Sequence, residues 1–194
     1  MNMKRISILT AVGIMALGGF VAYVYGGEKV PAGQPPLQNL NALNVTNIAK
    51  EFDAAKDDVR VLLFFSPTCP VCLEGASSAG RMLKAFSSKP VRTFIVWEPV
   101  LWTDWSAPST SALGRIPDPR AVQFWDKGRL LSHSMGEHNG HGIVWDYVAV
   151  YPPGPVWKDV APPSPIYDGG PVVRVTDKAQ SAIQKALMAG LSGE

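Results

Sequence analysis

The strongest pattern in the sequence is a continuous apolar run followed by a helical repeat. Residues 59–67 (VRVLLFFSP) have the length of a strand, and the run favours a strand buried on both faces of a sheet. From residue 70 to residue 87 the apolar positions recur every three or four residues, which predicts a helix. Residues 89–101 are β-branched and aromatic and predict a second strand. This order predicts a βαβ unit with two parallel strands.

Shorter elements are expected around this unit. Residues 102–120 are predicted to be an irregular connection, and residues 132–142 a polar loop. The other expected elements are a helix over 44–56, a short helix over 118–126, a hairpin of strands 143–151 and 156–160, and a closing helix over 176–191 capped by Thr176 or Asp177. Strands and helices alternate along much of the chain, which predicts an α/β domain.

The N-terminus carries an apolar segment long enough to cross a membrane. Lys4 and Arg5 precede residues 6–25, which are 20 residues without a charge. As a helix this segment would span roughly 30 Å, about the hydrocarbon thickness of a bilayer. The positive flank favours a cytoplasmic N-terminus, so the rest of the chain would be exported. A cleaved signal peptide is the alternative, with a weak small-residue site around Gly26.

These patterns divide the chain into three parts. Residues 1–26 are expected to be a membrane anchor or signal peptide, residues 27–41 a tether rich in Gly, Pro and polar residues, and residues 42–194 the domain. We expect anchoring in the cytoplasmic membrane, with the domain on the outer, periplasmic or extracytoplasmic side, where a disulfide persists. The formal net charge of +2, without a long basic run, gives no indication of nucleic-acid binding.

The only two cysteines, Cys69 and Cys72, lie where the first predicted strand gives way to the helix. The first turn of a helix leaves N–H groups unpaired and carries a partial positive charge, which stabilises a thiolate. Cys69 is expected at the N-cap, and Pro70 suits the first helical position because a missing N–H costs nothing there. Cys72 is expected on the same face of the helix. Such a pair exchanges disulfides, binds a metal or braces a turn.

The motif FFSPTCPVC at this junction, together with the order of the elements, resembles the thioredoxin-like fold superfamily. The resemblance covers roughly residues 42–191 and implies a central mixed sheet flanked by helices. It also implies that Cys69 attacks a disulfide and that Cys72 resolves the mixed disulfide, without a metal or organic cofactor. Protein disulfides or dithiols would be the substrates, and a redox partner protein would reset the pair.

The sequence departs from the usual thioredoxin pattern near the cysteines. Thr68 replaces the tryptophan that usually precedes the first cysteine, and Leu63 replaces the buried acid six residues before it. The cis-proline before the first hairpin strand is also missing, because Trp145 and Asp146 occupy that place. Asp146 or Glu98 is a candidate for the missing acid, the alternative being that both are solvated strand ends. The prolines that follow that strand are also candidates for the cis form: Pro152, Pro165 and Pro171.

The residue pair between the cysteines bears on the reduction potential. Strongly oxidising family members often carry a histidine there, which stabilises the thiolate. Val71 cannot do so, and the resemblance therefore implies a less extreme potential.

Two other functions compete with disulfide exchange. The first is copper or zinc handling by Cys69 and Cys72 with His133, His138 and His141, since thiolate and imidazole ligands suit these metals. Copper-delivering proteins of this fold, however, usually have three residues between their cysteines. The second is a non-catalytic binding domain with a vestigial pair. A purely structural disulfide is disfavoured, because closing so small a loop gains only on the order of 2 kcal/mol.

Four tryptophans have expected environments. Trp97 and Trp157 lie on predicted strands and are expected in the core. Trp102 and Trp105 lie in the irregular connection after Glu98, where they either pack locally or form an apolar lip that faces a substrate.

Overall fold

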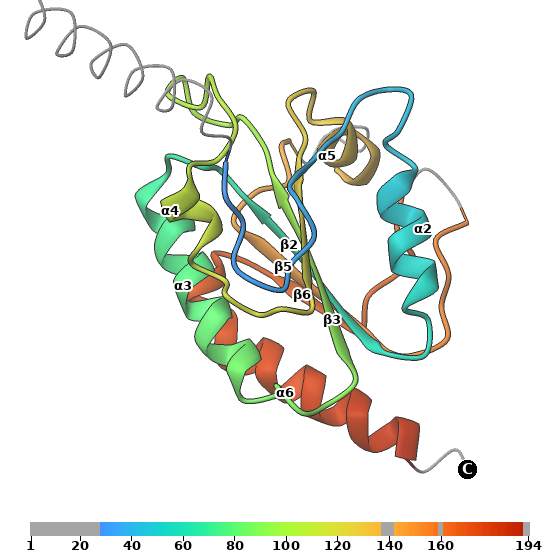
Figure 1. Cartoon of the computed structure of the whole chain (residues 1–194). Helices are drawn as coiled ribbons and strands as arrows, with labels where there is room; N and C mark the ends of the chain where they lie inside the picture. Colours follow the sequence, from blue (N-terminus) through green and yellow to red (C-terminus); the bar gives the residue numbers. More distant parts are fainter. Residues whose placement is uncertain (1–27, 137–141, 159–160, 192–194) are drawn as a thin grey trace, which may run out of the picture.

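Six strands among the described residues form one mixed sheet, which has helices on both faces (Figure 1). The computed structural model of the protein describes residues 28–136, 142–158 and 161–191. The elements are β1 (Gln38–Asn39), α2 (Asn47–Ala54), β2 (Val59–Phe65), α3 (Pro70–Lys84), β3 (Val91–Trp97), α4 (Thr110–Leu113), β4 (Ala121–Trp125), α5 (Leu130–Met135), β5 (Tyr147–Tyr151), β6 (Tyr167–Gly169) and α6 (Val172–Leu191).

The strands follow the order β1-β4-β3-β2-β5-β6 across the sheet. Neighbours from β1 to β2 are parallel, whereas β5 runs antiparallel to β2 and β6 runs antiparallel to β5. The predicted βαβ unit is confirmed, because β2 and β3 pair in parallel on either side of α3 along the chain. In Figure 1, α3 and α6 lie on one side of the sheet and α2 and α5 on the other. The α/β class with a mixed sheet flanked by helices is therefore confirmed.

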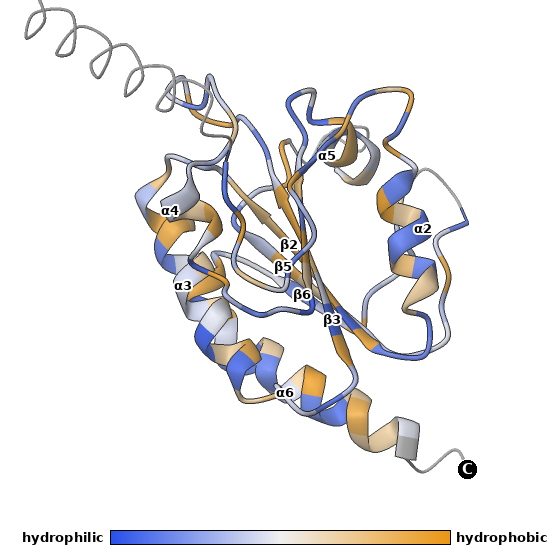
Figure 2. Cartoon of the chain, in the orientation of Figure 1, coloured by the Kyte–Doolittle hydropathy of each residue, from blue (hydrophilic) through white to orange (hydrophobic). Residues whose placement is uncertain are grey.

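The apolar run of β2 reflects burial on both faces of the sheet. Val61, Leu63 and Phe65 point into the core beneath α3 and α6, and this core also contains both cysteines. Leu62 and Phe64 point into the second core, beneath α2 and α5. The five side chains of β2 named here have no exposed surface. Figure 2 shows the corresponding concentration of apolar residues along the central strands.

The predicted short helix over 118–126 is wrong, because residues 121–125 form strand β4. All five residues of β4 are buried, and a short run buried on both faces carries no helical period. The polar member, Gln123, is accommodated by hydrogen bonds. Its Oε1 accepts from Trp97 Nε1 at 2.8 Å, and its Nε2 donates to the Leu113 carbonyl at 3.1 Å.

The predicted pairing of strands 143–151 and 156–160 is also wrong. Residues 155–158 form no strand, residues 159–160 lie outside the described part of the chain, and β5 pairs with β6 instead. Trp157 lies edge-on to Phe52 of α2, with ring centroids 5.5 Å apart. This segment therefore covers α2 instead of extending the sheet.

The closing helix begins earlier than predicted, at Val172 instead of after Thr176 or Asp177. The Val172 N–H donates to Asp146 Oδ1 at 3.0 Å, which satisfies one of the N–H groups that a helix start leaves unpaired. Ile183 of α6 is buried in the core that also contains both cysteines.

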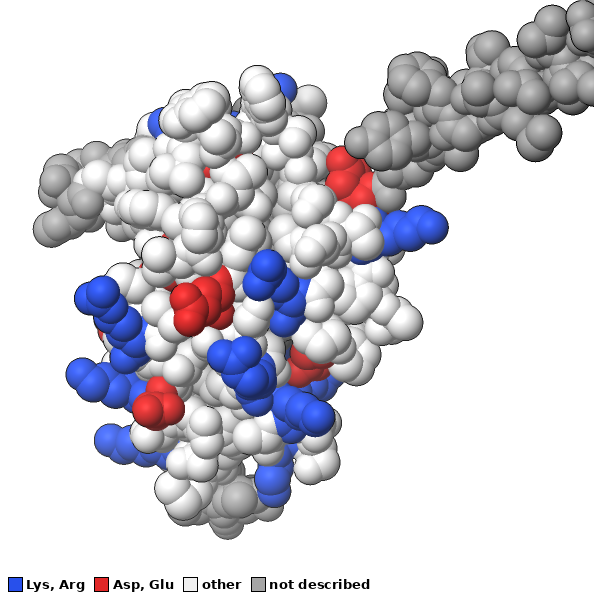
Figure 3. Space-filling model, turned by 90° about the vertical axis from the view of Figure 1, so that its left-hand side faces the viewer, with Lys and Arg blue, Asp and Glu red and all other residues white. Residues whose placement is uncertain are grey.

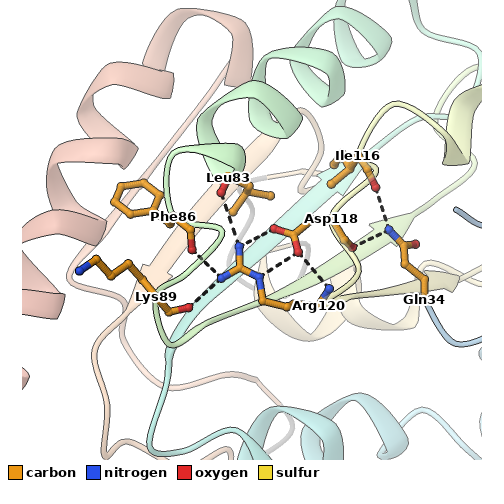
Figure 4. A network of polar contacts seen from close by, with 7 residues as sticks. All are labelled: Gln34, Leu83, Phe86, Lys89, Ile116, Asp118 and Arg120. Carbon is orange, nitrogen blue, oxygen red and sulfur yellow. Dashed lines mark hydrogen bonds and ion pairs between the residues drawn. The ribbon is translucent and has the colours of Figure 1, made fainter. Parts of the chain in front are cut away.

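Residues 28–41, the described part of the expected tether, lie against the domain. β1 pairs with β4, and Leu40 is buried. Gln34 Nε2 donates to the carbonyls of Ile116 and Asp118, both at 2.8 Å (Figure 4). This segment is thus part of the folded domain and does not hold the domain at a distance.

Arg120 joins the end of α3 to the start of β4. Its guanidinium lies 2.6 Å from Asp118 Oδ2 and donates to the carbonyls of Phe86 and Lys89 at 2.7 and 2.8 Å (Figure 4). The C-terminal end of the helix that carries the cysteines is therefore fixed to the sheet.

The expected membrane segment, residues 6–25, lies outside the described residues. Among the residues that are described, no helix combines the length and apolar character needed to span a bilayer.

Candidate functional site

Cys69 occupies the N-cap of α3, as predicted. Its backbone is extended (φ −73°, ψ 119°), and Pro70 is the first residue of the helix. The Cys69 carbonyl accepts the Leu73 N–H at 2.9 Å, which starts the helical hydrogen bonding. Both cysteines are free thiols, with Cys69 6% exposed and Cys72 fully buried. Cys69 is therefore the more accessible thiol of the pair.

Burial raises the pKa of the Cys72 thiol far above its ordinary value. A hydrogen bond with the Ser66 backbone acts in the opposite direction, whereas the Cys69 side chain and the charge of Asp146 raise the pKa further. Cys72 thus holds its proton and interacts directly with Cys69. The second cysteine needs a base before it can act as a nucleophile.

Asp146 is the acid that the structure brings to Cys72. Only 8% of Asp146 is exposed, and burial raises the pKa of its carboxyl, an effect opposed by the hydrogen bond from Val172 N–H. Asp146 has a left-handed backbone (φ 47°) directly before β5. Gly75 of α3 leaves room for it, since a Cβ there would lie 3.1 Å from Asp146 Oδ1. Of the two acids suggested by the sequence, Asp146 is the one beside the cysteines.

Asp104 fixes the loop that leads into the first cysteine. Its Oδ1 accepts from Thr68 N–H at 3.0 Å and Thr68 Oγ1 at 2.6 Å. Its Oδ2 accepts from Ser66 Oγ at 2.6 Å, Val100 N–H at 2.9 Å and Leu101 N–H at 2.8 Å. Asp104 therefore clamps the ends of β2 and β3 together directly before the cysteine motif.

Asp104 could not be predicted from the sequence, because it lies in an irregular connection without periodicity. The weak signal that remains is an aspartate within a stretch of turn residues, because such carboxylates often accept nearby backbone N–H groups. Burial alone would raise the pKa of Asp104, but hydrogen bonds from Ser66, Thr68, Leu101 and Val100 outweigh it and lower the pKa.

A groove of about 740 Å³ opens beside Cys69. Val71 and Trp145 line it, and the groove continues past the ends of β5 and β6 to Arg174 of α6. Its lining residues are Cys69, Val71, Met135, Gly136, Ile143, Val144, Trp145, Asp146, Tyr147, Asp168, Gly170, Pro171 and Arg174. Most of these residues are apolar or glycine, and three have acidic or basic side chains: Asp146, Asp168 and Arg174.

The cis peptide bond of the described chain lies between Gly170 and Pro171, after β6. Pro171 is one of the three prolines after that strand that were candidates for the cis form. It lines the same groove as Cys69, although it follows β5 in the sequence. The Gly170 backbone approaches Asp146 so closely that a Cβ on Gly170 would lie 2.2 Å from the Asp146 carbonyl oxygen. The Gly-Pro turn thus packs directly on the acid of the site.

Glu98 is buried and is not a solvated strand end. Its carboxylate accepts a hydrogen bond from helix α5. Its Oε1 accepts from Ser132 N–H of α5 at 3.2 Å, and its own N–H donates to the Phe65 carbonyl at 2.9 Å. Glu98 is not among the residues that line the groove. We therefore assign it to the attachment of α5 and not to the cysteine pair.

The histidines cannot be assembled into one site from the described residues. His133 is exposed on α5, whereas His138 and His141 lie outside the described part of the chain. Within residues 28–136, 142–158 and 161–191, no group of three His, Cys, Asp or Glu side chains is arranged to hold a metal ion. Metal binding by the cysteines and histidines stays a prediction.

The tryptophans differ in their exposure, and two of them are buried as the sequence predicts. Trp97 is fully buried and Trp157 is 6% exposed, so their core positions are confirmed. Trp102 is 87% exposed and Trp105 is 81% exposed, so local packing, one of the two alternatives for this pair, is wrong for both. Trp145, at 40% exposure, lies in the wall of the groove.

No protein-family model matches this chain, and comparisons with curated proteins and with solved structures gave no match either. The side chains around Cys69 are therefore the basis for assigning a function.

Proposed function

We propose that the protein is an exported, membrane-tethered thiol–disulfide oxidoreductase with a thioredoxin-like domain. The observation that carries the proposal is the position of Cys69 at the N-cap of α3, in contact with Cys72 and open to a groove. The parallel β2-α3-β3 unit, followed by antiparallel β5 and β6 and the closing helix, supports the thioredoxin-like part. The uncharged segment 6–25 supports export and tethering.

The first step is the attack of the Cys69 thiolate on one sulfur of a substrate disulfide lying in the groove. The substrate S–S bond breaks as the new bond to Cys69 Sγ forms. The other substrate sulfur leaves as a thiolate and takes a proton from solvent. The attacking sulfur belongs to the N-cap residue of α3, where a helix carries unpaired backbone N–H groups and a partial positive charge.

The second step releases the substrate and oxidises the pair. Cys72 gives its proton to the Asp146 carboxylate, and its sulfur attacks Cys69 Sγ. The second substrate sulfur leaves as a thiolate, so the substrate has gained two electrons and the pair has become a disulfide. A buried base is needed because the Cys72 thiol has no exposed surface and holds its proton tightly. A redox partner protein returns the pair to the dithiol, and the reverse sequence would oxidise a dithiol substrate.

The proposal is tested by mixing the reduced full chain, in detergent, with oxidised glutathione. We expect wild-type protein to form a disulfide between its own cysteines. Cys69→Ser should show no exchange above the background of the double serine variant. Cys72→Ser should accumulate a mixed disulfide with glutathione, detected by intact mass. Absence of exchange in the wild-type protein would refute the proposed chemistry.

A further inference from the structure

Two tryptophans next to the cysteine motif are turned outward. Trp102 is 87% exposed and Trp105 is 81% exposed, although most large apolar side chains of the described residues are partly or fully buried. Both belong to the connection between β3 and α4. Large apolar side chains that are exposed together mark protein or membrane contact sites, whereas single scattered ones are ordinary.

The loop that presents these tryptophans is held firmly against the cysteine motif. Asp104, which lies between them, is 4% exposed and binds Ser66 and Thr68 before the first cysteine. The Thr68 and Thr103 hydroxyl groups are also within hydrogen-bond distance, at 2.5 Å. The surface formed by Trp102 and Trp105 and the groove at Cys69 therefore keep a fixed relation to each other.

The same connection also receives the start of the described chain. The Lys29 N–H donates to Thr110 Oγ1 at 3.1 Å, at the first residue of α4. Only residues 26–28 separate Lys29 from the uncharged segment 6–25. A membrane that holds segment 6–25 must therefore lie close to the β3–α4 connection, because the four Cα–Cα steps from residue 25 to Lys29 span at most about 14 Å.

The charge distribution agrees with a membrane at this end of the molecule. Figure 3 shows most of the Lys, Arg, Asp and Glu side chains of one face in its middle and lower parts. Its upper part is mostly uncharged, apart from acidic and basic side chains at the right-hand edge and small basic areas near the top. The connection between β3 and α4 lies at the upper end in Figure 1, and so does the loop before α2, which carries Leu43 with 96% of its surface exposed. Apolar and aromatic side chains on an uncharged end match the chemistry of a lipid interface.

We propose that Trp102 and Trp105 insert into the interface of the bilayer that carries segment 6–25, and so hold the Cys69 groove at the membrane surface. This inference rests on the proposed function. It narrows the substrate class to disulfides or dithiols of polypeptides that lie at the membrane surface. Tryptophan suits this role because its ring is apolar and its indole N–H finds partners among lipid headgroups.

The experiment uses the full chain reconstituted into phosphatidylcholine vesicles with brominated acyl chains, which quench nearby tryptophan fluorescence. We expect wild-type emission to be quenched relative to vesicles of unbrominated lipid. The double variant Trp102→Phe/Trp105→Phe should lose most of this quenching, because Trp97, Trp125 and Trp157 are buried and Trp145 lies in the wall of the groove. Trp145→Phe is the matched control and should keep the quenching, since this exposed tryptophan lies in the groove wall.

A second measurement follows the rate of exchange. Trp102→Ala/Trp105→Ala should react normally with oxidised glutathione but at least about fivefold more slowly with a disulfide peptide tethered to a lipid. Equal quenching in wild type and the phenylalanine variant would overturn the inference, as would a rate defect of the alanine variant towards a soluble unfolded protein alone. Loss of exchange with glutathione in the wild-type protein would instead refute the proposed function.

Discussion

The Asp146 carboxylate accepts a hydrogen bond from the backbone N–H of Val172 at 3.0 Å. This contact joins the residue before β5 to the first residue of α6 and holds the acid beside Cys72. The same carboxylate fills space that the missing side chain of Gly75 leaves on α3. Three elements thus meet at one buried acid, and the mechanism assigns that acid the proton of the second cysteine.

Replacing Asp146 by Asn should slow the second step of exchange. Asn keeps an oxygen that accepts the Val172 N–H, but it cannot take the proton of Cys72. We expect glutathione to leave the mixed disulfide on the order of a hundredfold more slowly at pH 7, the size of effect typical of a lost general base. Rapid quenching with acid followed by mass analysis measures this rate. An unchanged rate would exclude Asp146 as the base.

The same variant should affect stability in a pH-dependent way. Burial raises the pKa of Asp146 above the unfolded value of roughly 3.9. The wild-type contribution to stability is therefore full below that pH and is lost as the pH rises through the folded pKa. Asp146→Asn does not titrate, so its free energy of unfolding relative to wild type should improve between pH 4 and pH 7. Urea unfolding at both pH values tests the sign, and a relative loss at pH 7 would contradict it.

Asp104→Asn should destabilise the protein in the opposite pH range. Its hydrogen bonds lower the pKa of Asp104, so the stabilisation is present above roughly pH 3.9 and is lost as the pH falls through the folded pKa. We expect a loss on the order of 3 kcal/mol at pH 7, from weakened hydrogen bonds to a charged group. The exposed Asp57 provides the control, since Asp57→Asn should change stability by less than about 0.5 kcal/mol. A pH-independent loss would argue against the charge as its cause.

Gly75→Ala should damage both stability and exchange. The new Cβ would lie 3.1 Å from both Asp146 Oδ1 and Val172 Cβ, and 3.4 Å from Phe65 Cε1. Crowding of about 1–3 kcal/mol then outweighs the gain of about 1 kcal/mol in helix propensity. At Gly190 of α6 the corresponding Cβ meets only Pro153 Cγ at 3.9 Å within 4 Å, so Gly190→Ala should be neutral or stabilising. Thermal unfolding of both variants distinguishes crowding from propensity.

Val71→His should make the pair more oxidising. Val71 is 46% exposed in the groove beside Cys69, so an imidazolium there is solvated and close to the thiolate that it would stabilise. Each tenfold stabilisation of the reduced form raises the reduction potential by about 30 mV. Equilibration with glutathione buffers measures the shift, and Val71→Asn, a polar residue without charge, is the control. A potential that falls in the histidine variant would contradict the electrostatic explanation.

The sequence predicts those elements of the fold that have a clear local pattern of apolar positions or a helix cap. The apolar run of β2, the repeat of α3 and the placement of Cys69 at their junction all follow from periodicity and capping, and the structure confirms them. Strand β4 could not be predicted in this way. Its polar residue Gln123 is buried because it accepts a hydrogen bond from Trp97, which is distant in the sequence. β6 is a three-residue strand containing Gly169, which is too short to show alternation.

The environment of the cysteines is predicted only in part, for the same reason. Asp146 could be suggested from its position before a strand, but its burial depends on Gly75 and on the start of α6. Asp104 depends on two loops that meet only in the folded chain. Such long-range contacts produce no periodic pattern in the sequence, and they therefore cannot be predicted from it.

The central claim, that Cys69 and Cys72 form a redox-active pair, is tested most directly by titrating the full chain against glutathione buffers. The fraction of protein with a Cys69–Cys72 disulfide is measured by thiol alkylation and intact mass. We predict one two-electron transition with a reduction potential between about −270 and −120 mV, the range of catalytic pairs. A pair that forms no disulfide at any glutathione ratio would contradict the account, and so would a structural disulfide with a potential below about −300 mV.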